Sequence, residues 1–383
     1  MSAIGSRLKK SHLKHRWSIG NNYLGGITFP KWWRLLSEND FQVDGVYAHR
    51  AAFITAMSLS NAVAGASERL RYSKAVRNHT IGRPPVFILG HWRSGTTHLH
   101  NLLAQDVNQF TFPNTFQVVN PETFLTTEAV SSRLFASLVP KKRPMDNVSM
   151  SFKTPQEDEF APAMLSLRSP YYSVTFPRAD GFYNRFLTFR DADPVDRQAW
   201  IDGFQWFLKK VSFRDKGQRA LLLKSPPHTA RVNLLLEMFP DAKFVHIHRH
   251  PHKVFRSFAH YHDTMAWYTF LQKPVVADLE GSMIERYREL YNTFLDNRPL
   301  IPSGQFHEVR FDELERKPLR CLHETYESLG LTGFEEARPR FEAYIESQRN
   351  YEKNCFTDLQ PRLKERLARS WGRFFEAFGY DSK

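Results

Sequence analysis

The sequence has few cysteines and lacks the segments typical of export or membrane insertion. Only two cysteines, Cys321 and Cys355, occur among 383 residues, too few for a disulfide framework or a thiolate metal cluster. The N-terminal segment is basic but has no apolar run of the kind found in signal peptides. The longest apolar stretch, near residues 51–66, is interrupted by polar side chains and is shorter than the roughly 20 residues that span a bilayer. We therefore expect a soluble, cytoplasmic protein.

The composition is that of a strongly basic globular protein. Hydrophobic residues make up 42% of the chain and charged residues 24%, which is enough for a hydrophobic core. The net charge of +13 favours anionic partners, such as nucleotides, nucleic acid or anionic lipid, without choosing among them. The 32 phenylalanines fit either a Phe-rich core or an aromatic-lined cavity.

Residues 1–82 are expected to form a helical extension, because apolar residues recur at helical spacing between Tyr47 and Tyr72. Before this helix comes an aromatic pair flanked by cations: Lys31, Trp32, Trp33 and Arg34. This pattern suits either peripheral membrane contact or packing onto the rest of the protein. The prolines at 84 and 85 end the helical pattern, so residues 83–383 are expected to form a second, catalytic domain.

After residue 83, short apolar strands alternate with helices. The expected strands cover residues 86–89, 220–224, 243–249 and 305–311, and the expected helices include 230–239, 254–262 and a closing helix at 361–378. Such alternation is typical of a parallel sheet covered on both faces. We therefore predict an α/β, P-loop-like three-layer fold, in which the stretch 108–215 supplies helices and loops around a substrate pocket.

A phosphate-binding turn is predicted between the first strand and the helix after it, where the chain reads Gly90-His91-Trp92-Arg93-Ser94-Gly95-Thr96-Thr97. Gly90 and Gly95 allow a tight turn around an oxyanion, and the backbone amides of Ser94–Thr97 would point at it from a helix N-terminus. The spacing of the glycines is that of a nucleotide triphosphatase loop, but Thr96 replaces the usual lysine. The cation is instead Arg93, and no Mg²⁺ is obviously required.

A second anion-binding segment is predicted after the strand that ends at Arg249. A turn containing Pro251 follows, and Ser257 lies in the next helix, so the turn returns a guanidinium and a hydroxyl to one anion. Four histidines in this segment, at positions 246, 248, 250 and 252, invite a zinc site. No carboxylate or thiolate stands at ligand spacing, so no metal is expected.

Together these segments resemble the sulfotransferase superfamily. Its first cofactor segment reads Pro, then Arg or Lys, then Ser-Gly-Thr-Thr; here Trp92 replaces the proline and the residues Arg93 to Thr97 match. The resemblance covers roughly residues 84–260 and is closer to the bacterial and tyrosine-sulfating branches. It implies transfer of a sulfuryl group from 3′-phosphoadenosine 5′-phosphosulfate (PAPS) to an acceptor hydroxyl. Residues 93–97 would bind the 5′-phosphosulfate, and Arg249 and Ser257 the 3′-phosphate.

Two lysines complete the set of candidates. Lys224 is expected, together with Arg93, to be a catalytic cation that offsets the charge developing on the leaving phosphate, with an exposed surface lysine as the alternative. Lys353 is a candidate for binding the nucleotide. Lys224 stands at the C-terminal end of a leucine-rich strand, where α/β sheets place their ligands, and several sulfotransferase branches carry a similar Lys-x-Pro element near the scissile bond. Related enzymes often return a basic or aromatic residue near the C-terminus to close over the nucleotide, and Lys353 is the candidate here.

The general base is expected in the acidic run Glu157-Asp158-Glu159, with Glu157 as the candidate. Three successive carboxylates repel one another unless cations face them, and crowding or burial raises the pKa of a carboxyl group, which suits a base. A solvated acidic helix start is the alternative. His228, four residues after Lys224, is the second candidate, and the steroid and phenol branch uses a histidine. His98 is the third.

The acceptor is not identified by the sequence. An aromatic group suggests a wall for a lipid, a steroid or phenol, or a sugar face: Tyr171, Tyr172, Phe176, Phe182 and Tyr183. Two alternative classes remain. A P-loop kinase or NTPase requires a lysine after Gly95 and an acidic Mg²⁺ ligand, and neither is evident. A basic nucleic-acid-binding protein requires a recognition motif that the chain lacks, so no nucleic-acid partner is expected.

Overall fold

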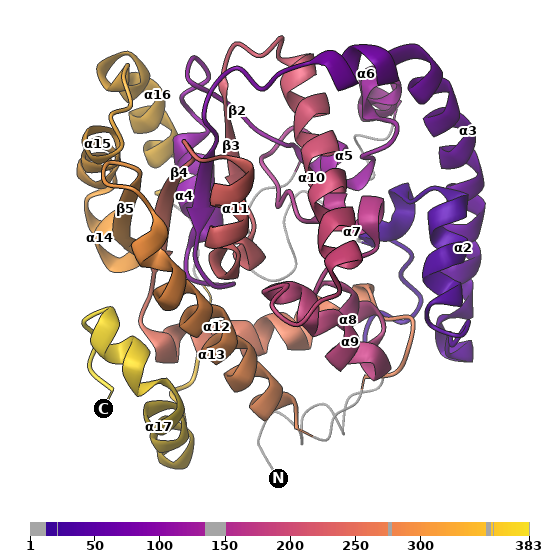
Figure 1. Cartoon of the computed structure of the whole chain (residues 1–383). Helices are drawn as coiled ribbons and strands as arrows, with labels where there is room; N and C mark the ends of the chain where they lie inside the picture. Colours follow the sequence, from indigo (N-terminus) through magenta and orange to yellow (C-terminus); the bar gives the residue numbers. More distant parts are fainter. Residues whose placement is uncertain are drawn as a thin grey trace.

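The computed structural model describes residues 13–20, 22–134, 151–274, 278–349, 354 and 356–382 (Figure 1). Within these residues the chain forms a five-stranded parallel sheet in the order β2-β3-β1-β4-β5. The strands are β1 (Val86–Leu89), β2 (Phe110–Thr111), β3 (Ala220–Lys224), β4 (Lys243–His248) and β5 (Phe306–Arg310). The four expected strands are present, and β2 was not predicted because a two-residue strand has no recognisable apolar pattern.

The sheet is the middle of three layers because successive strand residues point to opposite faces. In β1, Val86 and Ile88 join one hydrophobic cluster, and Phe87 and Leu89 join another. The helices that contribute to the first cluster are α4 (Thr96–Leu103), α14 (Phe311–Arg316), α15 (Pro318–Ser328) and α16 (Phe334–Ser347). Those that contribute to the second include α10 (Pro194–Arg214), α11 (Val232–Met238), α12 (Pro251–Thr264), α13 (Leu279–Asn297) and α17 (Pro361–Ala377). The predicted three-layer α/β fold is therefore confirmed.

Short elements connect β2 to α10 and surround the end of the sheet. The α-helices are α5 (Thr115–Val119), α6 (Phe124–Leu134), α7 (Phe160–Ser166), α8 (Tyr172–Thr175) and α9 (Asp180–Asn184). The 3₁₀ turns after residue 170 are η4 (Pro177–Ala179), η5 (Arg185–Leu187), η6 (Pro226–Ala230), η7 (Ala266–Tyr268) and η8 (Arg298–Leu300). Helix α12 begins three residues earlier than expected, since Pro251 is well suited to the first turn of a helix.

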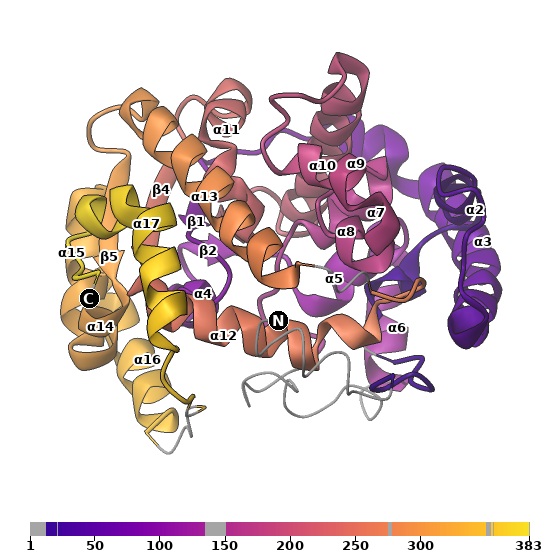
Figure 2. The ribbon, with the colours of Figure 1, turned by 90° about the horizontal axis from the view of Figure 1, so that it is seen from below.

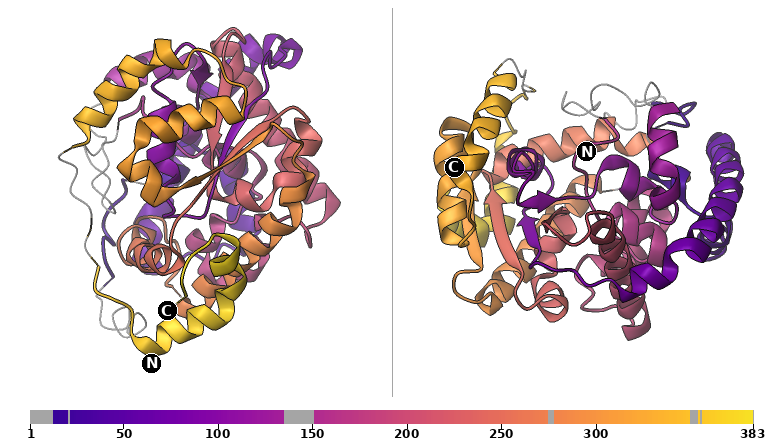
Figure 3. Two further views of the ribbon diagram at one scale, coloured as in Figure 1. Left: turned by 90° about the vertical axis from the view of Figure 1, so that its left-hand side faces the viewer. Right: turned by 90° about the horizontal axis from the view of Figure 1, so that it is seen from above.

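The N-terminal part of the chain is helical and lies at the edge of the molecule farthest from β5 (Figures 1 and 2). It contains η1 (Tyr23–Gly26), α2 (Phe29–Ser37), η2 (Gly45–Tyr47) and α3 (Ala48–Asn78). Figure 3 shows the indigo helices at one edge and the orange C-terminal helices at the other. A boundary between two domains at residue 82 stays a prediction.

The aromatic pair in α2 is divided between the core and the surface. Trp32 is fully buried, and its indole Nε1 donates to Thr55 Oγ1 at 2.8 Å. The prediction of membrane contact is therefore wrong for Trp32, which packs inside the protein as the alternative expected. Trp33 is 55% exposed. Among the described helices, none has the length and apolar content needed to cross a membrane.

A buried ion pair joins α3 to α10. Lys210 donates to the carboxylate of Glu68 and, at 2.5 Å, to the Pro121 carbonyl, and its ammonium lies 4.4 Å from the centre of the Phe124 ring. Burial lowers the pKa of Lys210, and the Glu68 charge opposes that shift. Because both side chains are buried, each charge depends on the other for stabilisation.

We expect Lys210→Met to lower the free energy of unfolding by about 3–5 kcal/mol, because it leaves the Glu68 charge buried without its cation. Urea unfolding followed by circular dichroism measures this change. The control is Lys209→Met, since the Lys209 ammonium donates to the Arg77 carbonyl at the surface. The double variant Lys210→Met/Glu68→Leu should recover much of the loss, and a double variant as unstable as the single one would contradict this account.

Candidate functional site

The loop after β1 turns back on itself before α4 begins. The amide and hydroxyl of Ser94 both donate to the His91 carbonyl, at 3.1 and 2.7 Å. Gly90 and Gly95 have positive φ angles, +147° and +106°. A Cβ atom on Gly90 would lie 2.4 Å from the Ile247 carbonyl oxygen, and one on Gly95 would lie 2.2 Å from the Phe311 ring. Glycine is therefore required at both positions for conformation and for space.

Arg93 links this loop to the second predicted segment. Its Nε donates to the Ser257 hydroxyl at 2.9 Å. Its φ angle is +72°, which a residue other than glycine adopts at a cost of about 1–3 kcal/mol. The first and second segments, separated by about 160 residues in the chain, thus meet at one place.

Arg249 lies at the same edge of the sheet. Strands β1 and β4 are parallel neighbours, with Leu89 opposite His246, so both chain segments leave the sheet side by side. The Arg249 guanidinium lies 4.3 Å from the centre of the Phe311 ring, which is the ring that also limits the space at Gly95. Phe311 therefore packs against both predicted anion-binding segments.

Three arginines concentrate positive charge here. Burial lowers the pKa of Arg249, and the nearby charges of Arg93 and Arg256 lower it further, against the opposing effect of Glu315 and Asp312. The Nε atoms of Arg249 and Arg256 are buried and have no hydrogen-bond partner among the described residues. Buried donors without partners are rare in proteins, and these fit an anionic ligand. Arg256 was not predicted as a site residue, although its position directly before Ser257 could have indicated it.

Lys224 lies on the other side of the loop, at the end of β3. Its side chain is only 1% exposed, and its Nζ donates to Glu157 Oε1 at 2.9 Å and to Thr97 Oγ1 at 3.5 Å. Lys224 thereby connects the first turn of α4 to the acidic run, and its place near the scissile bond stays a prediction. Its structural alternative, an exposed surface lysine, is excluded by its burial.

Each carboxylate of the acidic run has a basic side chain as its partner, which limits the repulsion that three successive carboxylates would otherwise exert on one another. The three pairs are Glu157 with Lys224 at 2.9 Å, Asp158 with His228 at 2.5 Å, and Glu159 with Arg231 at 2.7 Å. Lys224 ends β3, His228 lies in the turn η6 that follows, and Arg231 lies directly between η6 and α11. The run is therefore not a solvated acidic helix start.

Asp158 holds this arrangement in place from within the core. It is fully buried, and its Oδ1 accepts from the Lys224 backbone amide at 2.8 Å while Oδ2 binds His228 Nε2. Burial by itself raises the pKa of Asp158, but His228 and the backbone hydrogen bond together hold this pKa below its usual value. Asp158 is therefore an ionised anchor for the strand end that carries Lys224.

Glu157 is the carboxylate of the three that reaches the surface of the site. Its side chain is 16% exposed, whereas those of Asp158 and Glu159 are fully buried. The Tyr171 hydroxyl donates to its second oxygen. His228 is fully buried against Asp158, so it lacks the access that a base needs. The His98 ring packs 6.5 Å from the Phe311 ring.

The predicted aromatic wall is mostly core. Tyr172, Phe176 and Tyr183 are fully buried, so the prediction that they form a substrate wall is wrong; Phe182 packs against the same cluster. Tyr171 differs, because its ring lies 6.3 Å from that of Trp92 in the loop. Of the predicted aromatic group, Tyr171 is therefore the one that contacts both the loop, through Trp92, and Glu157.

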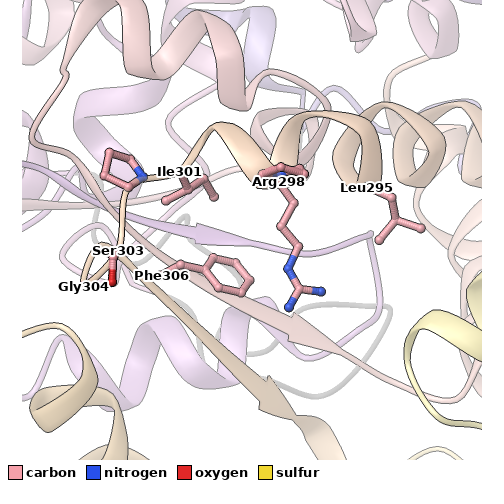
Figure 4. A pocket seen from close by; sticks show the side chains of 8 residues that line it. Leu295, Arg298, Ile301, Ser303, Gly304 and Phe306 are labelled. Carbon is pink, nitrogen blue, oxygen red and sulfur yellow. The ribbon is translucent and has the colours of Figure 1, made fainter.

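Two cavities differ in their relation to this site. One of about 90 Å³ is lined by Phe258, Phe270 and Met283, among others, and Phe258 stacks on Trp92 at 5.9 Å. The other, of about 510 Å³, lies beside η8 and the start of β5 and includes Arg298 and Phe306 (Figure 4). Because parallel strands bring their C-terminal ends to the phosphate loop, the start of β5 is at the opposite end of the sheet.

Two further predictions concern Lys353 and the absence of a metal. Lys353 lies outside the described residues. In the described ranges, no three histidine, cysteine, aspartate or glutamate side chains are grouped as a metal site requires. His246, in the predicted histidine cluster, instead binds the Glu308 carboxylate through Nδ1 at 2.8 Å.

A parallel α/β sheet with a phosphate loop at its C-terminal edge is the setting of many group-transfer enzymes. Residues 84–336 match the model of the sulfotransferase family. The chain belongs to this family and is a sulfotransferase; the kinase and nucleic-acid-binding alternatives have no support from the comparisons.

Relatives include the omega-hydroxy-beta-dihydromenaquinone-9 sulfotransferases Stf3 of Mycobacterium bovis and Mycobacterium tuberculosis. Each is 34% identical over 356 residues, which cover 93% of this chain and 90% of the relative. Among solved structures, sulfotransferase STF1 from Mycobacterium tuberculosis has a TM-score of 0.63 at 19% identity and covers 96% of this chain and 97% of its own. Sulfotransferase STF9 from Mycobacterium avium has a TM-score of 0.63 at 16% identity, with coverages of 93% and 97%. These structures support the fold.

We expect Asp158→Asn to lower the free energy of unfolding by about 1–3 kcal/mol at neutral pH, because it weakens a buried charged hydrogen bond. The pKa of Asp158 is lower in the folded than in the unfolded protein. Its charge therefore stabilises the fold above the unfolded pKa of about 4, and this contribution is lost as the pH falls through the folded pKa.

Urea unfolding of the wild type and Asp158→Asn between pH 7 and pH 3 checks this. The difference between the two proteins should shrink below about pH 4. A difference that stays constant down to pH 3 would contradict the assignment of Asp158 as an ionised anchor.

Proposed function

We propose that this sulfotransferase moves a sulfuryl group from PAPS to a hydroxyl of an apolar, lipid-like acceptor. The observation that carries the proposal is the hydrogen bond between Arg93 and Ser257, which lies beside Arg249. The ion pair of Lys224 and Glu157 lies at the end of β3, the strand next to β1. Basic side chains for the 5′-phosphosulfate and for the 3′-phosphate of PAPS would thus lie on either side of a carboxylate that can accept a proton.

The donor end of the site is assigned from the loop after β1. Arg93, Ser94, Gly95, Thr96 and Thr97 would hold the 5′-phosphosulfate through backbone amides, hydroxyls and one guanidinium at the N-terminus of α4. PAPS supplies the sulfuryl group when bound. The loop contributes binding and orientation, which provide much of the rate in such transfers.

The 3′-phosphate is assigned to Arg249 and Ser257, with Arg256 as a third contact. The fit rests on the two buried Nε atoms that lack partners among the described residues, since a phosphate offers acceptors to such donors. Lys353 stays a prediction as a residue that closes over the nucleotide.

Glu157 is proposed as the general base and Lys224 as the cation beside it. Glu157 would take the acceptor proton on a carboxylate oxygen as the acceptor oxygen bonds to sulfur and the sulfur–oxygen bond to the donor phosphate breaks. Lys224 Nζ, between Glu157 and Thr97, would stabilise the charge that develops on the departing phosphate. No residue in this scheme requires a metal.

A lipid-like acceptor is supported by the Stf3 relatives, whose name specifies a hydroxylated menaquinone derivative. The cavity of about 90 Å³ bounded by Phe258, Phe270 and Met283 adjoins the loop through Trp92, but its lining also contains Asp180 and Arg286 and it has room for only a short apolar segment. Because Trp32 is buried, we assign peripheral membrane contact through α2 to Lys31, Trp33 and Arg34. This enzyme would then meet its acceptor at a membrane surface.

The decisive experiment is transfer of radiolabelled sulfate from PAPS to a lipid extract, with separation of the products by chromatography. Label in an apolar alcohol supports the proposal, and Arg93→Ala should give none. Label confined to sugars or to water-soluble phenols would overturn the assignment of the acceptor. No transfer from PAPS to any fraction would overturn the assignment of the donor.

We expect Arg249→Ala to weaken binding of adenosine 3′,5′-bisphosphate by about 10- to 100-fold, because one charge-assisted hydrogen bond to the 3′-phosphate is lost. Adenosine 5′-monophosphate lacks that phosphate, so its affinity should change by no more than about twofold. Isothermal titration calorimetry measures both, with Arg316→Ala as the control from a neighbouring surface helix. Equal losses for the two ligands would contradict the role of Arg249.

We expect Glu157→Gln to lower kcat by about 10²- to 10⁴-fold, because the amide cannot take the acceptor proton. Affinity for adenosine 3′,5′-bisphosphate should remain close to that of the wild type. Steady-state rates measured with PAPS and the identified acceptor check the first value and calorimetry the second. The variant His228→Gln should lower the free energy of unfolding, because His228 binds the buried Asp158. If His228→Gln lowers kcat and Glu157→Gln does not, His228 and not Glu157 is the base.

A further inference from the structure

Helix α3 exposes several apolar side chains and buries several polar ones beside Ile54 and Val76, whereas an ordinary surface helix buries a mainly apolar face. On its inner face Ser58, Asn61 and Glu68 are buried. On its outer face Leu59 is 51% exposed, Val63 73% and Leu70 90%. The inner polar groups have partners in the fold, for example Asn61 with the Gly25 carbonyl at 2.8 Å. The fold therefore accounts for the inner face and leaves the outer face uncovered among the described residues.

The exposed apolar residues follow a heptad. They are Ala52, Ala56, Leu59, Val63, Ala66 and Leu70, all of them exposed. Their separations alternate between four and three residues, the spacing of the two apolar positions in a coiled-coil seam. We call this row the α3 stripe; it runs for about 27 Å along the helix. Figures 1 and 2 show α3 at the outer edge of the molecule, where another chain can reach it.

We propose that two copies of this protein associate through antiparallel packing of their α3 stripes around a twofold axis near residue 61. The positions of the stripe are symmetric about that residue. In antiparallel pairing Ala52 faces Leu70 of the second copy, Ala56 faces Ala66, and Leu59 faces Val63. Large residues thus face small or medium ones, and the alanines let the two backbones approach closely.

The charges of α3 agree with this direction of pairing. No charged residue occurs between positions 51 and 67, whereas Arg69, Arg71, Lys74 and Arg77 are exposed at the C-terminal end. Parallel pairing would bring the two basic ends together. Antiparallel pairing separates them along the length of the helix and leaves an uncharged middle, so that no like charges meet across the twofold axis.

A second copy suits the α3 stripe better than a membrane does. Helices that lie on membranes have a broad apolar face and lysines or arginines along its borders. The stripe is only as wide as the contact between two helices of a coiled coil. The positions beside it from 53 to 67 include Thr55, Ser60 and Ser67 but no lysine or arginine. The membrane alternative remains a distinct outcome of the test below.

Sedimentation equilibrium of the full chain tests the association directly. The wild type should show a monomer–dimer equilibrium, and Val63→Asp should raise the dissociation constant at least about tenfold. The matched control is Val195→Asp, since Val195 is 76% exposed at the start of α10 and should change nothing. Circular dichroism confirms that each variant is folded. A wild type that stays monomeric at high micromolar concentration would overturn the proposal.

Cysteine cross-linking tests the register and does not depend on the tolerance of a buried charge. In a background of Cys321→Ser and Cys355→Ser, proteins carrying Leu59→Cys and Val63→Cys are mixed and oxidised. This pair should form a mixed disulfide dimer, and so should Ala52→Cys with Leu70→Cys. The mismatched pair Ala52→Cys with Val63→Cys lies about 10 Å out of register and should give much less. Equal cross-linking of all pairs would overturn the antiparallel register.

Vesicles of anionic phospholipid provide the third readout. Val63→Asp should leave sedimentation with vesicles unchanged if the stripe binds a second copy. Loss of vesicle binding in Val63→Asp without any change in self-association would overturn the proposal in favour of a lipid surface. None of these measurements uses sulfuryl transfer, so the association and the proposed acceptor can fail independently.

Discussion

The position of β1 between β3 and β4 is the constraint on which the site depends. Because all three strands are parallel, their C-terminal ends meet at one edge. The loop after β1 therefore has Lys224 from β3 on one side and Arg249 from beyond β4 on the other. Reversal of any one of these strands would carry its cation to the opposite edge, so the cationic site is a direct product of the sheet order.

Phe311 and the glycines of the loop allow the loop and Arg249 to lie close together. The Phe311 ring occupies the space beside Gly95 and lies against the Arg249 guanidinium. Apolar contact on one face of a guanidinium leaves its donors to be satisfied at the edge. The loop can approach so closely only because Gly95 has no side chain. A core residue at the start of α14 thus limits the space beside the loop and contacts the arginine of the second segment.

Much of the fold and part of the site could be predicted from the sequence, for physical reasons that differ by residue. Buried strands such as β1 are continuous apolar runs, and glycines with an arginine between them identify the loop. The acidic run required basic partners, and Lys224, His228 and Arg231 are those partners. The partner of each carboxylate could not be assigned in advance, since nothing local fixes how residues 157–159 lie against β3.

Other features depend on tertiary contacts that leave no local pattern. Tyr172 and Tyr183 were expected at a substrate wall because aromatic composition does not distinguish a core from a cavity. Trp32 and Trp33 are adjacent, yet helical geometry sends one inward and one outward. The outer face of α3 was not anticipated, because both faces of this helix contain small and apolar residues and the sequence does not show which one the fold covers.

The pairing of residues 157–159 with the end of β3 and the turn after it also has a consequence for folding. Neither partner segment can enter the core alone without carrying bare charge into a medium of low polarity, which is strongly unfavourable. Docking of the two segments is therefore expected to be concerted, and a partly opened molecule would release the acidic run and the β3 turn together. Glu157, the proposed base, is thus tied to the cooperative unit of the fold.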